Sequence, residues 1–196
     1  YFGRAKDFGP QYVRGISEGN GTPSGSDMWL TYSVNKEDIW ISRIPVPIRF
    51  RTDKPAEDLF DELDLEGKIP DWNIYRTRWA TVKIAAFPDT QNKSLELKDR
   101  DPYDYARAVR VFKESKSTGI SFRLYAQQTQ NGRLEIEVLD HAGQRPVWVM
   151  FGEDGHVRVA DGSNVIDGGR YEENSWHHLK ININVAAGNY DVFLND

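Results

Sequence analysis

The chain has 196 residues, no cysteine and a formal net charge of −5 at pH 7, with 39% hydrophobic and 28% charged residues. This composition is typical of a folded globular protein and argues against wholesale disorder. The absence of cysteine excludes disulfides, thiolate metal sites and thiol catalysis. The mild negative charge argues against nucleic acid as a partner, and no apolar run approaches the roughly 18 residues of a membrane-spanning helix.

The first fifty residues predict a loop followed by a β-hairpin. Residues 9–25 are dense in Gly, Pro, Asn and Ser, which is typical of a loop. Residues 28–34 alternate as a strand, 35–38 form a turn and 39–44 form the return strand. Pro45 and Pro47 then end the pairing, because proline cannot donate to a strand ladder. A lone hairpin is not independently stable, so we expect the other strands of its sheet to lie upstream of this chain.

The remaining residues predict a β-sandwich. The acidic segment 53–66 permits either a short helix or an opening strand. From residue 81 onward, strand signals recur about every 8 to 12 residues between turns that contain glycine, which favours an antiparallel sandwich. No helical pattern separates the strands, so a βαβ architecture is not expected. The expected strands span 82–87, 94–98, 106–112, 120–126, 134–139, 147–151, 157–159, 164–166, 179–185 and 190–194.

The last hairpin has the clearest pattern in the chain. Apolar and polar residues alternate over 179–185, which predicts a strand with one buried face. His177 shares the parity of the apolar residues, so we expect it to point inward and to be hydrogen-bonded. Trp148 lies in an apolar strand and is also expected in the core. The chain ends at Asn195-Asp196, which is typical of a turn, so we expect a final strand to be missing and the chain to be part of a longer protein.

A glycine-rich segment near the start holds the first candidate site. Arg14 offers a planar fork that suits a carboxylate, and Glu18 with Asn20 has the groups to bind hydroxyls. The neighbouring glycines would let the backbone approach a ligand closely. The alternative is a connector whose Arg and Glu face solvent.

The predicted first hairpin carries a second set of candidates. Tyr32 and Glu37 match a pair that can act together at an anomeric carbon, because the carboxylate makes the phenol more nucleophilic. Lys36 would hold an anionic substituent. The alternative is a polar hairpin loop whose charges keep it soluble.

An aromatic group in the middle of the chain is the candidate carbohydrate-binding surface. Sugars lay their C–H faces on aromatic rings while their hydroxyls meet fixed polar groups. The candidates are Trp72, Tyr75, Tyr103 and Tyr105. Tryptophans are also common core anchors, and Trp72 and Trp79 fit that alternative too.

The acidic loop around Asp99, Asp101 and Asp104 is the one candidate metal site. Calcium takes hard oxygen ligands of this kind from loops. The spacing lacks the pattern of a dedicated calcium loop. No other cofactor is expected.

Several phrases resemble a known family. Residues 14–23, 29–40 and 43–48 resemble the closing blade of secreted bacterial β-propellers of the sialidase-like class. Residues 72–75, 99–112 and 176–177 resemble segments of a following sandwich of the concanavalin A-like or LamG type. The resemblance implies an all-β fold with two parts: residues 1–50 as the terminal hairpin of an incomplete propeller, and residues 51–196 as a jelly-roll β-sandwich.

The same resemblance implies a function. The full-length protein would be a glycoside hydrolase or polysaccharide lyase that is secreted, periplasmic or on the surface of a bacterium. The sandwich would bind a poly- or oligosaccharide or brace the upstream propeller, and the chain alone is not expected to be active. Sialidase-like propellers use an arginine cluster and a Tyr-Glu pair, roles that only Arg14, Tyr32 and Glu37 match here, and their Ser-x-Asp-x-Gly-x-Thr-Trp repeat is absent. The alternative is a structural or protein-binding sandwich.

Overall fold

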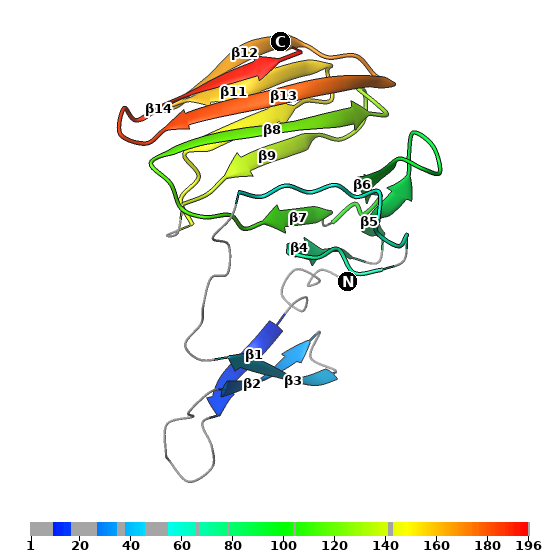
Figure 1. Ribbon diagram of the computed structural model, residues 1–196, viewed down its shortest axis with the longest axis vertical. Coiled ribbons are helices and arrows are strands. Elements are labelled where there is room, and N and C mark those ends of the chain that lie inside the picture. Colours follow the sequence, from blue (N-terminus) through cyan, green and yellow to red (C-terminus); the bar gives the residue numbers. More distant parts are fainter. Residues whose placement is uncertain are drawn as a thin grey trace. The chain divides into compact units, whose positions relative to one another are not determined.

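The computed structural model describes residues 10–16, 27–34, 38–45, 55–65, 67–77, 79–103, 105–140 and 143–195. These residues form fourteen strands and no helix, so the predicted all-β class is confirmed (Figure 1). Among them, no helix is long and apolar enough to span a membrane. The chain divides into two compact units, Tyr1–Lys113 and Glu114–Asp196. The predicted boundary after residue 50 stays a prediction.

The first unit begins with an antiparallel sheet in the order β1-β2-β3 (Figure 1). Strands β2 (Asp27–Val34) and β3 (Asp38–Pro45) form the predicted hairpin. Strand β1 (Pro10–Ile16) lies in the stretch that we expected to be loop, so that expectation is wrong. Pairing with β2 overrides the local Gly and Pro content, and the register shifts between Gln11 and Arg14.

The rest of the first unit holds two further strand pairs. Strand β4 (Trp72–Tyr75) pairs with β7 (Arg107–Arg110), and β5 (Ala80–Ala86) pairs with β6 (Lys93–Asp99). Strand β5 buries Ala80, Val82 and Ile84 on one face and exposes the residues between them. The described part of the acidic segment, 55–65, is neither helix nor strand, so both expectations for it are wrong.

Hydrogen bonds explain why the acidic segment runs as an irregular chain. The Asp61 carboxylate accepts from the Lys93 backbone N–H at 2.7 Å, and the Lys93 ammonium donates to the Leu63 carbonyl at 2.7 Å. These long-range bonds attach the segment to the start of β6. They replace the local bonds that a helix or strand would have formed.

The second unit is a sandwich of two antiparallel sheets, as predicted (Figure 1). One sheet has the order β12-β11-β10-β9, and the other has the order β14-β13-β8. Their bounds are β8 Ser117–Ala126, β9 Leu134–Val138, β10 Val147–Phe151, β11 His156–Asp161, β12 Asn164–Arg170, β13 Ser175–Asn184 and β14 Asn189–Leu194. The two inner faces meet in a core that includes Val149, Phe151, Val157, Leu179 and Ile181.

His177 lies in this core as predicted. It is 4% exposed, and its Nε2 lies 2.9 Å from the Glu172 carbonyl oxygen. A carbonyl only accepts, so Nε2 carries the proton and Nδ1 is free to accept from the Asn195 amide, 3.3 Å away. Both ring nitrogens of His177 are therefore hydrogen-bonded.

Trp148 differs from its predicted core position. Its neighbours Val147 and Val149 fill the core, so the pleat turns Trp148 to the outer face of the sheet. There it is half-buried, and its indole N–H donates to the Glu135 carboxylate at 3.0 Å. In a continuous apolar run, the sequence does not indicate which residues face inward, and the prediction for Trp148 was therefore wrong.

Candidate functional site

The β4–β7 ribbon presents two chemically different faces. The register pairs Trp72 with Arg110 and Tyr75 with Arg107. Side chains directly opposite each other in a strand pair share a face. One face therefore carries Trp72, Ile74, Ala108 and Arg110, and the other carries Asn73, Tyr75, Arg107 and Val109.

The first face attaches the ribbon to the rest of its unit. Trp72 packs on Phe60 with ring centroids 6.2 Å apart. Arg110 Nε donates to the Asp58 carboxylate at 2.9 Å, and the guanidinium also donates to the Asp71 carbonyl at 3.3 Å. Because both partners are mostly shielded from water, this ion pair fixes the ribbon more firmly than a solvent-exposed pair would.

The second face forms an open hollow of about 520 Å³. Tyr75 and Tyr105 lie together there with ring centroids 5.7 Å apart and planes tilted by 48°. Tyr75 is 37% exposed and Tyr105 is 54% exposed, so the hollow has large aromatic surfaces open to solvent. We call it the tyrosine groove. It is lined by Asn73, Tyr75, Arg107 and Val109 of this face, by Tyr105, and by Ile74, which lies between Asn73 and Tyr75 in β4.

Two polar side chains complete the groove. Arg107 and Asn73 are exposed, and no hydrogen bond or ion pair joins either side chain to another residue in the described part of the chain. Arg107 presents a planar set of donors, and the Asn73 amide offers both a donor and an acceptor. Aromatic faces beside convergent polar groups are the arrangement that binds a sugar ring and its hydroxyls.

The structure brings together two of the four aromatic residues among the predicted carbohydrate-binding set. Tyr75 and Tyr105 meet in the groove, whereas Trp72 lies on the opposite face of the ribbon, where it acts as a core anchor. Its indole N–H is buried with no hydrogen-bond partner among the described residues. Tyr103 is 74% exposed and does not line the groove.

The acidic loop uses its described carboxylates for its own hydrogen bonds. Asp99 accepts from the Asp101 backbone N–H at 2.8 Å, and Asp101 accepts from the Thr77 hydroxyl at 2.6 Å and from the Tyr103 N–H at 3.0 Å. Asp104 lies outside the described residues. Within the described ranges, no group of three or more acidic or histidine residues is placed to hold a metal ion. The calcium site stays a prediction.

The candidates in the first fifty residues are placed only in part. Arg14 is exposed on β1, opposite Thr31 on β2. Tyr32 is half-buried on β2, and its hydroxyl lies 2.8 Å from the Ser42 hydroxyl. The other four candidates fall outside the described residues, and they are Glu18, Asn20, Lys36 and Glu37. The proposed Tyr-Glu pair is therefore still a prediction.

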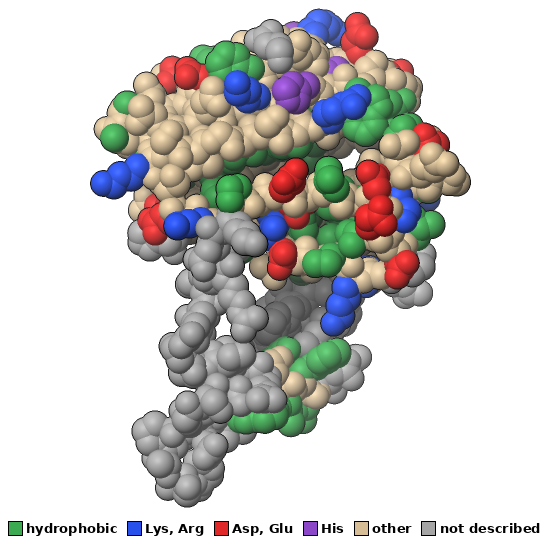
Figure 2. All heavy atoms as spheres, viewed as in Figure 1, with side chains coloured by type: hydrophobic (Ala, Val, Ile, Leu, Met, Phe, Trp, Pro, Cys, Tyr) green, Lys and Arg blue, Asp and Glu red, His purple; other side chains and the backbone are tan. Residues whose placement is uncertain are grey.

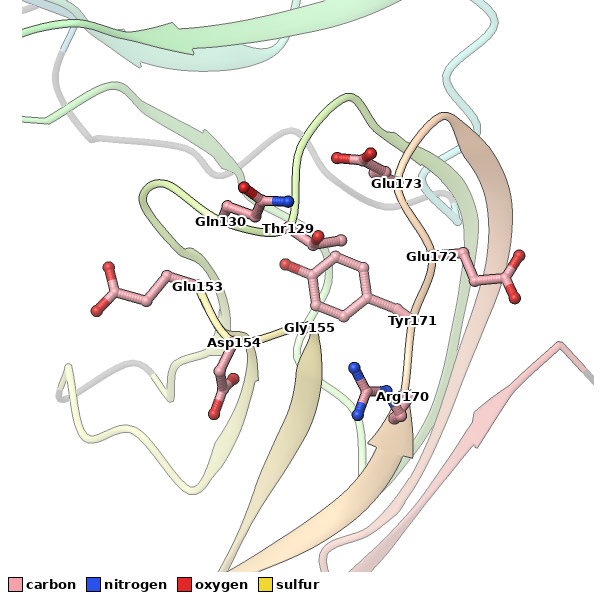
Figure 3. Close-up of a pocket in the computed structure, with 9 residues that line it drawn as sticks. All are labelled: Thr129, Gln130, Glu153, Asp154, Gly155, Arg170, Tyr171, Glu172 and Glu173. Atoms are coloured by element: carbon pink, nitrogen blue, oxygen red, sulfur yellow. The ribbon is translucent and has the colours of Figure 1, made fainter.

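The second unit has another open hollow, of about 400 Å³ (Figure 3). The Tyr171 ring lies among its lining residues, but its hydroxyl donates to the Gly152 carbonyl at 2.7 Å and its ring packs against Phe151. Glu153 and Glu172 point away from the hollow (Figure 3). Asp154 is paired with Arg158, which holds the pKa of that carboxyl well below its usual value. The side chains named above that line this hollow therefore stabilise the fold or face solvent. The tyrosine groove is the better candidate for a binding site.

Sequence reasoning missed Arg107 and Asn73 as members of the site. A period of two over 105–109 places Tyr105, Arg107 and Val109 on one side of a strand, which was a usable signal. The pairing of β4 with β7, which adds Asn73 and Tyr75, joins segments more than thirty residues apart. No local pattern in the sequence discloses that pairing.

Comparisons with known proteins identify the family. Residues 72–196, well over half of the chain, match the family model described as Sialidase-like, CBM domain. A solved structure described as "Sialidase" is 38% identical with a TM-score of 0.75, and the match covers 96% of this chain and 17% of that one. This chain thus spans about a sixth of the sialidase that it matches.

A curated protein also matches a short segment. The RTX-II toxin-activating lysine-acyltransferase ApxIIC of Actinobacillus pleuropneumoniae is 38% identical over 52 residues, which are 26% of this chain and 32% of that protein. So short a match does not define a family. The match to the sialidase-like model does, and it confirms the resemblance noted in the sequence. This chain belongs to the sialidase-like CBM domain family.

Proposed function

We propose that this chain is the carbohydrate-binding part of a sialidase-like protein and that the tyrosine groove is a sugar-binding site. The observation that carries the proposal is the exposed pair Tyr75 and Tyr105 beside Arg107 in an open hollow. Family membership supports the ligand class, since the family model is that of a carbohydrate-binding domain.

The geometry accounts for how a sugar would be held. The planes of the two rings are tilted by 48°, so the rings do not form one flat shelf, and we infer that a sugar lies in a shallow trough between them. A pyranose that lies in this trough presents its C–H groups to one or both rings. The Asn73 amide and the Arg107 guanidinium then lie at the edge of the trough, where the hydroxyls of the sugar point outward.

The size of the site limits its affinity. Covering roughly 100 Å² of exposed apolar surface at about 25 cal/mol per Å² gains roughly 2.5 kcal/mol. A few hydrogen bonds at about 1 kcal/mol each add to this gain, while association itself has an entropic cost. We therefore expect weak binding of a short oligosaccharide, with a dissociation constant of roughly 10⁻³ M or higher. Tighter binding would require a polymer that engages more than one site.

For the full-length protein we propose the activity that the resemblance implies. It would be an exported glycan-degrading enzyme, either a glycoside hydrolase or a lyase, and this chain would bind its substrate or brace its catalytic propeller. The support is the 38% identity to a sialidase of which this chain spans 17%. Cell fractionation of the source bacterium tests the location, and a full-length protein found only in the cytoplasm would refute it.

A glycan array tests the binding proposal directly. Wild-type chain should bind a subset of oligosaccharides, and Tyr75→Ala/Tyr105→Ala should lose at least ten-fold in affinity for them. Tyr103→Ala is the matched control, because Tyr103 is also an exposed tyrosine but does not line the groove. Circular dichroism verifies that each variant is folded. Unchanged binding by the folded double variant, or no glycan bound by wild type, would overturn the proposal.

A further inference from the structure

The outer face of the β14-β13-β8 sheet gathers basic and aromatic side chains. Strand β13 turns His177, Leu179 and Ile181 into the core, so Trp176, His178 and Lys180 face outward. In Figure 2, basic and histidine side chains lie together over β13 and β8. We call this surface the basic sheet face, and its members are Arg123, Tyr125, Trp176, His178, Lys180 and Phe193.

The strand register places these residues in three successive rows that run across the strands. Trp176 lies opposite Tyr125, and His178 lies opposite Arg123. In the next row, Lys180 lies opposite Phe193 of β14. Diagonal neighbours in such rows are about 7–8 Å apart. The backbone positions of Arg123 and Lys180 are diagonal neighbours of this kind, so one oligosaccharide chain can span both side chains.

Arg123 is held in place without being neutralised. Its guanidinium carbon lies 4.8 Å from the centre of the Trp176 ring, and Trp176 in turn packs edge-on against Tyr125 at 5.3 Å. Stacking uses the flat face of the guanidinium and leaves the N–H donors along its edge available. Among the described residues, no carboxylate pairs with Arg123, in contrast to Arg110 and Arg158. A stacked, unpaired guanidinium is a preorganised receptor for an acidic group.

Lys180 repeats the arrangement one row away. Its ammonium lies 5.7 Å from the centre of the Phe193 ring, and no ion pair joins it to another described residue. His178 lies opposite Arg123, and its Nε2 is 2.8 Å from the Ser121 hydroxyl. The three strands place one carboxylate on this face, Asp191, which lies a row beyond Lys180. The face is thus locally positive on a chain whose net charge is −5.

We propose that the basic sheet face is a second ligand site, specific for an acidic oligosaccharide that bears carboxylate or sulfate groups. Arg123 would donate two N–H groups to one acidic group in a bidentate contact, and Lys180 would donate to a second acidic group farther along the sugar chain. That the ligand is a saccharide rests on the proposed function. That it is acidic rests on the two cations, Arg123 and Lys180, which have no ion-pair partner among the described residues. Two cations are too few for a duplex nucleic acid, which needs an extended basic surface.

Calorimetry with a defined pair of ligands tests this proposal. The probes are an oligogalacturonate and its fully methyl-esterified form, which share a sugar backbone and differ in charge. We expect the intact chain to bind the acid and not the ester, and to lose affinity as salt is raised. Arg123→Gln should weaken binding roughly ten- to hundredfold. Arg123→Lys, which keeps the charge but loses the fork, should fall between wild type and Arg123→Gln.

Two further variants separate the sites. Lys83→Gln is the matched control, because Lys83 is an exposed lysine on β5 with only a long 4.0 Å contact to Glu96, and it should bind like wild type. The groove variant Tyr75→Ala/Tyr105→Ala should keep its affinity for the acidic probe. Loss of acid binding in that variant alone would overturn the second site and leave the groove proposal standing. Equal binding of acid and ester, unchanged binding by Arg123→Gln, or equal binding of duplex DNA would also overturn it.

Discussion

Replacing Ile181 in the middle of β13 should lower the free energy of unfolding of the sandwich. The loss should be larger for a smaller side chain and largest for a charged one. Ile181 is 0% exposed and lies opposite Ile120 on β8 and Val192 on β14. It also belongs to the core cluster with Leu179 and Phe151. The cluster packed around this position is hydrophobic, so a new charge there would be poorly solvated.

The magnitude follows from what each substitution removes. Ile181→Val deletes one methylene and should cost about 1 kcal/mol, and Ile181→Ala should cost about 2–5 kcal/mol because a cavity remains. Ile181→Asp adds the burial of an ionisable group and should exceed the alanine variant by several kcal/mol. Since whole domains are stable by only about 5–15 kcal/mol, the aspartate variant should be largely unfolded at 25 °C.

Urea unfolding followed by tryptophan fluorescence measures this series, with Trp176 on the same strand as a nearby reporter. Asn182→Ala is the control, since Asn182 points to the opposite face, and it should change the free energy of unfolding by less than about 0.5 kcal/mol. An Ile181→Asp protein that unfolds cooperatively at the wild-type midpoint would refute the assigned orientation of β13.

Two other predictions concern the loop around Tyr171. Tyr171→Phe removes the hydrogen bond to the Gly152 carbonyl, which still accepts from the Gly155 N–H at 3.1 Å, so the urea midpoint should fall by the equivalent of about 1 kcal/mol. Asp154→Asn should abolish a pH-dependent contribution to the free energy of unfolding. Hydrogen bonding to Arg158 lowers the pKa of Asp154 below its usual 3.8. The folded state therefore gains stability above about pH 4 and loses it as the pH falls toward the lowered pKa. The stability difference between wild type and Asp154→Asn should therefore be largest near neutral pH and shrink below pH 4, and a difference that grows on acidification would contradict this assignment.

The sequence predicted the sandwich well where burial is one-sided. Alternation over β13 located the buried positions Leu179 and Ile181 and the inward His177, because one face of that strand meets the core and the other meets water. In β10 the residues on both faces are apolar, so alternation vanished and Trp148 was wrongly placed inside. Strand β1 was missed because its pairing with β2 outweighs the local preference of a Gly- and Pro-rich stretch.

The candidate site was predictable only in its residue types. The aromatic residues near 75 and 105 were identified from the sequence, and Tyr75 with Tyr105 form the groove. The sequence did not predict which aromatic residues would be exposed, because that depends on the pairing of β4 with β7. The same long-range pairing adds Arg107 and turns Trp72 to the opposite face.

The proposal that the tyrosine groove binds sugar is tested most directly by following the backbone amide signals of the chain during titration with an oligosaccharide selected on the array. We predict that the largest shifts fall on Asn73, Tyr75, Tyr105 and Arg107, with saturation at roughly millimolar ligand. Shifts that saturate elsewhere and leave these four residues unchanged would contradict the assignment of the site.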